Sequence, residues 1–325
     1  MDNIFNGKNV LVTGGTGMIG QPLVRQLLQK GARVRVVSLD SQVRAQPGTE
    51  FLQLDLTSFE NCMRAADGIN YVFHLAGIKG SPAMTAQKPA SFFYPTISFN
   101  TQMLEAARRQ GAERYLFTSS IGVYSPDKVL QEDAVWKTFP SENDRFAGWA
   151  KRMGELQLDA YRIEYGWKHL TCVRPANVYG PYDNFDPKNA MVIPSLINRA
   201  LTGENPFKVW GDGSAIRDFI FAEDCAEGIL KVFEENPQQP VNLGCGKGIS
   251  IRELVETLSD LLPKPLNIEW DITKPTGDQI RVLDMSRAEA LGFVTRTSLR
   301  DGLKETLDWY VANRHQVEER YNVFR

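Results

Sequence analysis

Cysteine is scarce in this sequence, and the few cysteines present form no metal or disulfide pattern. Only four occur in 325 residues, at positions 62, 172, 225 and 245. No two are close enough to make a C-x-x-C pair, which excludes a zinc site or redox-active disulfide built on that motif. We expect free thiols, which are typical of a reducing compartment, and we predict a cytoplasmic protein.

Long apolar runs and a charge imbalance are also absent. No stretch of about 18 apolar residues occurs, so the sequence predicts no membrane span, and the N-terminus lacks the apolar region of a signal peptide. Lysine and arginine total 37 against 39 aspartates and glutamates, a net charge of −2. This balance argues against a nucleic-acid or anionic-membrane partner. An anionic ligand would have to be held by local basic groups and backbone amides.

The first half of the chain contains a regular alternation of short apolar strands and longer helical stretches. The predicted helices cover residues 18–30, 98–110 and 144–164. The predicted strands cover 10–13, 33–38, 51–54, 71–74, 115–118 and 169–173. Such alternation indicates a parallel sheet covered on both faces. We therefore predict an α/β fold of the Rossmann type, a doubly wound parallel sheet with a ligand crevice at the carboxyl ends of its strands.

This alternation stops after about residue 180, where prolines punctuate the chain. Strands at 219–221 and 241–243 are predicted to return to the sheet, and helices at 250–262 and 298–313 to form a smaller lobe. We predict a cofactor-binding domain of residues 1–180, to which 218–244 return. Residues 181–217 and 245–325 are predicted to form a smaller, discontinuous C-terminal substrate lobe.

A glycine-rich turn, TGGTGMIG, occupies residues 13–20 between the first predicted strand and helix. Its spacing is G-x-x-G-x-x-G. Gly14 permits a tight turn, Gly17 lets backbone approach a pyrophosphate, and Gly20 lets the helix pack closely on the strand. The amides at the start of the helix then face the phosphates. The turn predicts dinucleotide binding.

The end of the second strand should carry the residue that contacts the 2′-position of the adenosine ribose. Ser38 takes the usual acidic position, and Asp40 follows two residues later. Ser38 would tolerate a 2′-phosphate, which Arg44 could pair with, whereas Asp40 could bind a ribose hydroxyl. The choice between NAD and NADP stays open.

Five segments carry motifs that occur together in one enzyme family. They are the glycine-rich turn, DL at 55–56, HLAG at 74–77, SSIGVY at 119–124 and RPANVYGP at 174–181. Together they resemble the extended short-chain dehydrogenase/reductases, the NAD-dependent epimerase/dehydratase family. Within it the chain is most similar to the GDP-fucose synthase subgroup, on DNF at 183–185, VIP at 192–194, VWG at 209–211, RDF at 217–219 and TKP at 273–275.

This resemblance implies a homodimer, NAD or NADP as cofactor, and a nucleotide-sugar substrate held by the smaller lobe. The residues that it assigns to the cofactor are Gly14, Gly17, Met18, Ile19, Gly20, Asp55, Leu56, Leu75, Ala76, Gly77, Asn100, Lys151, Pro175, Asn177 and Val178. The residues that it assigns to the substrate are Asn177, Val192, Trp210, Arg217 and Lys274. Arg217 suits phosphate because a planar guanidinium pairs with two oxygens. Trp210 is either an aromatic wall for the nucleotide or a core residue.

The family's chemistry uses a serine and a Tyr-x-x-x-Lys pair on one helix face, and this chain keeps part of that set. Ser120 takes the serine position and Lys151 the lysine position, but the tyrosine position is Ala147. Three explanations are open: an engineered tyrosine-to-alanine variant, a natural enzyme whose proton carrier is water, Ser120, Asp144 or Glu142, or a homologue that binds without turnover. Losing an acid/base group lowers a rate about 10²–10⁴-fold, so slow turnover is compatible with alanine.

Two further positions separate this chain from the subgroup, which epimerises two sugar carbons with a cysteine and a histidine. Gly122 and Met191 stand there, and neither carries a proton. We therefore predict no 3,5-epimerisation and favour an oxidoreductase that reduces a 4-keto group or oxidises a 4-hydroxyl, on a GDP-sugar. A 4-epimerase or 4,6-dehydratase is the alternative within the enzyme class, and a non-catalytic binding or regulatory protein on the same fold is the alternative outside that class. Residues 274–281 depart from the subgroup's pattern, which leaves the nucleotide base open.

Overall fold

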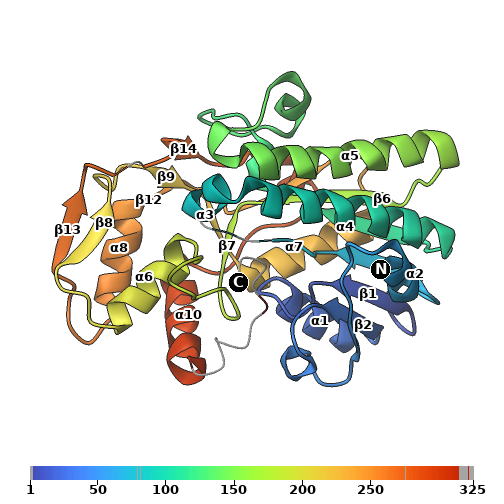
Figure 1. The fold of residues 1–325 in the computed structure, drawn as a ribbon, viewed down its shortest axis with the longest axis horizontal. Coiled ribbons are helices and arrows are strands. Elements are labelled where there is room, and N and C mark those ends of the chain that lie inside the picture. The colour runs from blue at the N-terminus through green and yellow to red at the C-terminus, as the bar shows by residue number, and fades with distance from the viewer. Residues whose placement is uncertain (1–2, 79, 81, 275, 315–320, 322–325) are drawn as a thin grey trace.

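A seven-stranded parallel sheet forms the centre of the described part of the chain (Figure 1). The structure, a computed structural model, describes residues 3–78, 80, 82–274, 276–314 and 321. The strands lie in the order β11, β6, β5, β4, β1, β2, β3. Their bounds are β1 Asn9–Thr13, β2 Arg33–Ser38, β3 Glu50–Gln53, β4 Tyr71–His74, β5 Arg114–Thr118, β6 Leu170–Pro175 and β11 Val241–Leu243. This order is the doubly wound arrangement, so the predicted fold class is confirmed.

The strand order changes direction beside β1, and this feature positions the site. β1 pairs with β2 on one side and β4 on the other, with Thr13 opposite both Val37 and His74. The connections that leave β1 and β4 run to opposite sides of the sheet, which opens a crevice between the carboxyl ends of these strands.

Helices cover both faces of the sheet. Alternate residues of β1 face the two layers: Val10 and Val12 pack in the core under α1 and α7, and Leu11 in the core under α2, α4 and α5. The bounds are α1 Gly20–Gln29, α2 Phe59–Ala66, α3 Pro82–Gln87, α4 Pro89–Arg109, α5 Arg145–Tyr165 and α7 Ala222–Glu235. Short 3₁₀ helices lie at η1 Gln42–Arg44, η2 Ile121–Val123, η3 Glu132–Lys137 and η4 Glu142–Asp144.

Helix α4 is longer than the sequence predicted. It begins at Pro89, well before the predicted start at residue 98, and it contains Pro95 in its interior. Proline usually marks a helix boundary because it lacks an N–H and crowds the preceding turn. Here the first proline takes the helix start, where no N–H is needed, and the helix continues past the second.

The smaller lobe has a core of its own, which includes Phe185, Leu196, Leu254 and Leu303. Its elements gather on the left of Figure 1. They are α6 Val192–Leu201, β8 Phe207–Trp210, α8 Ile251–Asp260, β13 Ile268–Asp271 and α10 Leu299–Asn313. A small sheet of β9 Ile216–Arg217, β12 Ile249–Ser250 and β14 Ile280–Arg281 lies between this lobe and the central sheet (Figure 1). No helix among the described residues is both long and apolar enough to span a bilayer.

The predicted strand at 219–221 forms, but not where it was expected. β10 (Phe219–Phe221) pairs with β7 (Asn177–Tyr179) in a separate two-stranded sheet, and of the two predicted returning strands only β11 joins the central sheet. The chain bends after β6, so β7 leaves the plane of the sheet and takes β10 with it. Beyond β14, Leu283, Met285 and Phe293 pack back into the core beneath α7, with α9 (Ser286–Ala290) between them.

A buried ion pair ties α5 to the central sheet. Arg174 on β6 donates from Nε and Nη2 to the two carboxylate oxygens of Glu155 on α5, at 3.0 and 2.7 Å. Their side chains are 1% and 3% exposed. Ser119, just beyond β5, donates to the same carboxylate, and Arg174 also donates to the hydroxyl of Tyr124 at 3.0 Å. The pair therefore fixes β5, β6 and α5 relative to one another.

We predict that Glu155→Gln lowers the free energy of unfolding by about 3–5 kcal/mol, because it leaves the Arg174 charge buried without a counterion. Denaturant titration followed by circular dichroism measures the change. Lys304→Gln, which breaks the exposed pair between Lys304 and Asp308, is the control and should leave the midpoint in place. A Glu155→Gln protein as stable as the unmodified chain would contradict the role given to this pair.

Candidate active site

The glycine-rich turn brings the start of α1 close to the end of β1. Gly14 has a φ of +70°, in the left-handed region that favours glycine, and its N–H donates to the Val37 carbonyl at 2.7 Å. A Cβ on Gly20 would lie 2.4 Å from the carbonyl oxygen of Gly14, and one on Gly14 would lie 3.2 Å from the backbone of Ala76. Only glycine at position 20 allows the helix to begin here.

The first turn of α1 offers free amide groups. Its N-cap residue, Ile19, supplies no side-chain acceptor, and no acidic residue lies in the turn. Among the described residues, no backbone carbonyl accepts from the N–H groups of Met18, Ile19 and Gly20. Free N–H groups and the helix dipole make such a start a phosphate site. The turn therefore fits the pyrophosphate of a dinucleotide.

Ser38 and Asp40, the predicted ribose selectors, form one hydrogen-bonded group at the end of β2. Ser38 donates to the hydroxyl of Thr16 at 2.7 Å, and Thr16 donates to Oδ2 of Asp40 at 2.7 Å. Nε of Arg44 lies 3.6 Å from the same carboxylate oxygen, and both side chains are largely buried. Because the Arg44 guanidinium balances the charge of Asp40, the end of β2 would repel a 2′-phosphate only weakly. The Asp40 carboxylate can still accept a hydrogen bond from a ribose hydroxyl.

A chain of hydrogen bonds crosses from β1 to α4 behind the crevice. Thr13 Oγ1 accepts the N–H groups of Leu75 and Ala76 at 3.1 and 3.0 Å, so it donates its own proton to Nδ1 of His74 at 2.9 Å. Nε2 of His74 then donates to Oδ1 of Asn100 at 3.1 Å. Burial lowers the pKa of His74 to about 3, which keeps the ring neutral. The side-chain amide nitrogen of Asn100 is left buried, without a partner among the described residues, and a bound ligand would supply its acceptor.

Lys151 lies at the carboxyl end of β5. Its Nζ donates to the Thr118 carbonyl at 2.8 Å and stands 5.0 Å from the centre of the Phe117 ring. Burial lowers the pKa of Lys151 to about 8. The hydroxyl of Thr118 is also buried, without a partner among the described residues. Thr118 is the last residue of β5, so a second unpartnered polar atom at the carboxyl end of the sheet is available to a ligand.

Ser120 lies in the turn that follows β5 and begins η2. Its Oγ accepts the N–H of Gly122 at 3.0 Å. Ala147 precedes Lys151 by one turn of α5, on the same face. A Cβ on Gly148 would lie 2.4 Å from the carbonyl oxygen of Gly122, so α5 packs directly against this turn. The structure thus places Ser120 and the Ala147–Lys151 face of the helix against the same edge of the sheet.

Three of the predicted substrate residues meet at one edge of the lobe. Nη2 of Arg217 donates to the Thr276 carbonyl at 3.1 Å, and Nζ of Lys274 stands 6.0 Å from the centre of the Trp210 ring. Trp210 is 57% exposed, so it is a surface aromatic and not a core residue. Within the described chain Arg217 has no carboxylate partner within 4 Å and donates only to backbone carbonyls. Its charge is therefore available to an anion.

The other two predicted substrate residues have structural contacts. Val192 is half-buried and packs on the core of the lobe. Asn177 donates from its side chain to the Asp218 carbonyl at 2.8 Å. The Asp218 carboxylate, whose pKa is raised by burial, accepts three backbone N–H groups, those of Cys245, Gly246 and Leu283.

The remaining predicted cofactor residues lie at or beyond the carboxyl ends of β3, β4 and β6. Asp55 is exposed, and its carboxylate accepts the N–H and hydroxyl of Thr57 at 2.9 and 2.8 Å. Leu56 is buried, and Gly77 is exposed just beyond β4. Pro175 ends β6, and Val178 lies half-buried in β7. Pro275, part of one motif, lies outside the described residues.

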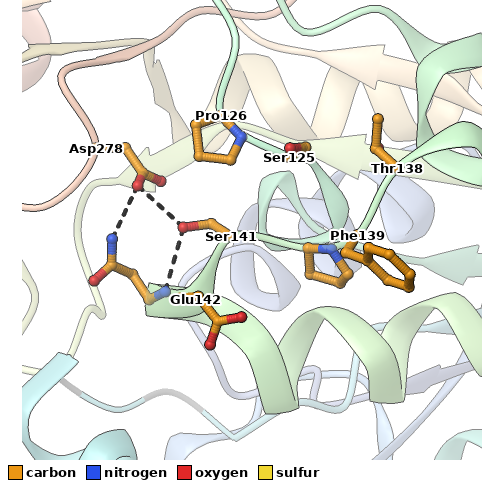
Figure 2. A pocket seen from close by; sticks show the side chains of 9 residues that line it. Ser125, Pro126, Thr138, Phe139, Ser141, Glu142 and Asp278 are labelled. Atoms are coloured by element: carbon orange, nitrogen blue, oxygen red, sulfur yellow. Dashed lines mark hydrogen bonds between the residues drawn. The ribbon is translucent and has the colours of Figure 1, made fainter.

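Sequence reasoning missed two residues that join the lobe to the start of α5. Oδ1 of Asp278 accepts from Ser141 Oγ and Asn143 Nδ2, at 3.0 and 2.9 Å, beside a cavity of about 510 Å³ (Figure 2). Arg281 on β14 donates to Asp144 Oδ2 at 2.5 Å. The only available signal was the departure of residues 274–281 from the subgroup pattern, which does not say what they contact.

Fold and site together define a dinucleotide-binding enzyme of the Rossmann type. The chain belongs to the NAD-dependent epimerase/dehydratase family, whose model it matches over residues 10–244. The cofactor is accordingly NAD or NADP, and the free amides of α1 and the unpaired atoms of Asn100 and Thr118 fit it.

Relatives of this chain act on nucleotide-linked sugars. It is 30% identical over 312 residues to GDP-L-fucose synthase 1 of Arabidopsis thaliana, covering 94% of this chain and 93% of the relative. It is also 30% identical to dTDP-4-dehydro-6-deoxy-D-allose reductase of Streptomyces bikiniensis, covering 94% and 96%. Among solved structures it resembles a UDP-glucose 4-epimerase of Thermotoga maritima with UDP-glucose, at a TM-score of 0.83 and 27% identity over 94% of this chain and 99% of the other.

The lowered pKa of Lys151 makes the free energy of unfolding depend on pH in a defined direction. Its pKa is about 8 when folded and 10.5 as an ordinary lysine, so between these values the unfolded chain binds more protons. The free energy of unfolding contributed by Lys151 therefore rises as the pH rises from about 8 to 10.5. We predict that Lys151→Met is more stable than the unmodified chain at neutral pH and that this difference shrinks toward pH 10.5.

Denaturant titrations of both proteins across this pH range measure the difference. The same variant should bind NAD or NADP at least about 10-fold more weakly, because a charge-assisted hydrogen bond is worth about 1.5–3 kcal/mol. Parallel stability curves for the two proteins would show that Lys151 is not buried as a cation.

Proposed function

We propose that this protein is an NAD(P)-dependent oxidoreductase that reduces a 4-keto group, or oxidises a 4-hydroxyl, on a nucleotide-linked sugar. The observation that carries the proposal is that Ser120 and Lys151 lie at the sheet edge, with Arg217, which has no described carboxylate within 4 Å, on the lobe side. In this proposal the hydroxyl, ammonium and guanidinium groups line one crevice between the sheet edge and the lobe. That set fits a sugar carbon next to a nicotinamide and a diphosphate next to the lobe.

Each side chain has a defined task in this proposal. The cofactor supplies or removes a hydride when bound. Lys151 holds its ribose hydroxyls, and Asn100 donates its free N–H to a ligand atom in the crevice. Ser120 donates its hydroxyl proton to the sugar oxygen, since that proton is not used within the turn. Arg217 binds the diphosphate through two parallel N–H groups.

The lobe of residues 181–217 and 245–325 holds the nucleotide in this proposal, with Trp210 and Lys274 at its edge. A GDP-sugar is the favoured substrate, because GDP-L-fucose synthases are among the relatives that match this chain along most of its length. Exposed Trp210 offers a flat apolar surface to a base, and the adjacent Lys274 ammonium favours an anionic ligand.

We further propose a cytoplasmic homodimer. The four cysteines are free thiols, which suits a reducing compartment. Large apolar side chains on α4 and α5 remain exposed, among them Tyr94 at 67%, Leu156 at 49% and Ile163 at 86%, and a second copy would cover them.

A substrate panel tests the proposed reaction. Purified protein is mixed with NADH or NADPH and the 4-keto-6-deoxy forms of GDP-, dTDP- and UDP-sugars, and loss of the reduced nicotinamide is followed by absorbance. We expect substrate-dependent oxidation, fastest with the GDP-sugar. Arg217→Gln should raise KM about 10–100-fold with a smaller change in kcat, as expected for loss of a charge-assisted contact.

A second panel, the unmodified GDP-, dTDP- and UDP-hexoses with oxidised NAD or NADP, identifies the alternatives. Interconversion of 4-hydroxyl epimers with no net change in the nicotinamide identifies a 4-epimerase, the activity in the name of the Thermotoga structure. Release of water from the hexose identifies a 4,6-dehydratase. Tight cofactor binding with no reaction of any sugar identifies a non-catalytic homologue.

The absence of a cysteine and a histidine at positions 122 and 191 gives a separate prediction. Turnover in D₂O should place no deuterium on C3 or C5 of the sugar, because removing a carbon-bound proton needs a base against each face of the ring. Mass spectrometry of the product measures this. Deuterium at either carbon would refute the prediction of no 3,5-epimerisation.

A further inference from the structure

The missing tyrosine leaves the proposed reaction without its usual proton-exchanging side chain, and two carboxylates lie near the vacated position. Glu142 has a side chain that is 86% exposed, and its nearest cation is Arg145, at 3.7 Å, which is also exposed. Asp144 is 31% exposed and lies against the turn that holds Ser120. Of these two groups, only Asp144 is directed toward the site.

Asp144 and Ser120 lie on either side of Gly122. The position that a Cβ would take on Gly122 is 3.4 Å from Ser120 Oγ, 3.4 Å from Asp144 Cβ and 3.5 Å from Asp144 Cγ. Glycine therefore leaves open the space between the hydroxyl and the carboxylate. A water molecule in that space would relay a proton between the two groups through hydrogen bonds nearly as good as direct ones.

Arg281 holds the carboxylate in this orientation. Its Nη1 donates to Oδ2 of Asp144 at 2.5 Å, and its Nη2 donates to the Ile121 carbonyl at 2.9 Å. One guanidinium thus fixes Asp144 against the turn that carries Ser120. Oδ1 of Asp144 accepts no hydrogen bond from any described residue, and Ser120 Oγ accepts from Gly122 while its own proton stays free to move.

We propose that Asp144 replaces the missing tyrosine as the proton acceptor of this enzyme, working through the hydroxyl of Ser120. The inference rests on the proposed function. In the oxidation direction the sugar 4-hydroxyl gives its proton to Ser120 Oγ, and Ser120 gives its own proton to Oδ1 of Asp144, directly or through one water. A bound oxidised nicotinamide would accept the C4 hydrogen with both electrons as hydride, which would leave C4–O as a carbonyl.

The oxidation produces one proton, which must be released to solvent. One hydroxyl compound and one oxidised nicotinamide give one ketone, one reduced nicotinamide and one proton. Asp144 takes that proton and passes it to solvent, which its partial exposure allows. Reduction of a 4-keto sugar runs the same steps in reverse, with Asp144 taking a proton from solvent and Ser120 donating one to the sugar oxygen.

Asp144→Asn, with Glu142→Gln as the matched control, is the direct test. Asp144→Asn should lower kcat about 10²–10⁴-fold, the usual loss when a positioned acid/base is removed, with KM for the nucleotide sugar changed less than about threefold. Glu142→Gln removes an exposed carboxylate two residues away and should keep kcat within about twofold. Unchanged cofactor affinity and denaturation midpoint show that Asp144→Asn is folded.

A rescue experiment separates proton transfer from a structural role. Adding Ala147→Tyr to Asp144→Asn returns a proton carrier to the face shared with Lys151, and should recover at least about 10-fold of the lost kcat. A lost ion pair with Arg281 is not repaired by a phenol at position 147, so a purely structural role for Asp144 predicts no recovery.

Gly122→Ala is the second variant, and it carries the test if Asp144→Asn does not fold. Its methyl group makes only ordinary contacts but occupies the space between Ser120 and Asp144. We expect a folded protein whose kcat falls at least about 10-fold.

The outcomes distinguish this inference from the proposed function. If the unmodified protein converts no sugar in the panel, the proposed function fails and the proton acceptor fails with it. If the unmodified protein is active, and folded Asp144→Asn or Gly122→Ala keeps full kcat, the assignment of Asp144 is overturned while the proposed function stands. Loss of kcat in Asp144→Asn without recovery by Ala147→Tyr also overturns it.

Discussion

The bidentate contact between Arg174 and Glu155 is the interaction on which the geometry of this site depends. Two charges held at 1% and 3% exposure are costly to remove from water, and they persist because each is hydrogen-bonded to the other and to neighbouring groups, Ser119 for Glu155 and Tyr124 for Arg174. Glu155 belongs to the same helix as Lys151, and Arg174 stands on the strand beside β5. The helix that carries Lys151 is therefore held in one position on the sheet.

Two glycines on α5, Gly148 and Gly154, also fix the position of this helix. The helix meets the turn of Ser120 so closely that a Cβ on Gly148 would overlap the Gly122 carbonyl oxygen, and one on Gly154 would lie 2.4 Å from the Phe117 ring. The ion pair between Arg174 and Glu155 holds α5 against the sheet, and the lack of side chains at Gly148 and Gly154 allows this close contact. Ala147 therefore lies on a helix that packs directly against the turn of Ser120.

The sequence alone predicted the parts of the fold that depend on local signals. The period of apolar residues located the strands, and the strand–turn–helix setting of the glycines located the tight turn into α1, because both signals are complete within a few residues. β10 was predicted in the wrong sheet because its partner is β7, and the local sequence does not show that β7 leaves the central sheet after β6. Asp278 and Arg281 were missed because their partners, Ser141, Asn143 and Asp144, lie about half the chain away.

Because Leu283, Met285 and Phe293 pack into the core beneath α7, the central sheet cannot be separated cleanly from the C-terminal part of the chain. A fragment that stopped after β11 would keep the whole central sheet, yet it would expose the apolar surface of α7 and leave the Asp218 carboxylate without the N–H groups of Cys245, Gly246 and Leu283. A minimal nucleotide-binding module therefore cannot be obtained by ending the chain after β11. It would have to keep residues 245–293 or carry a redesigned outer surface on α7.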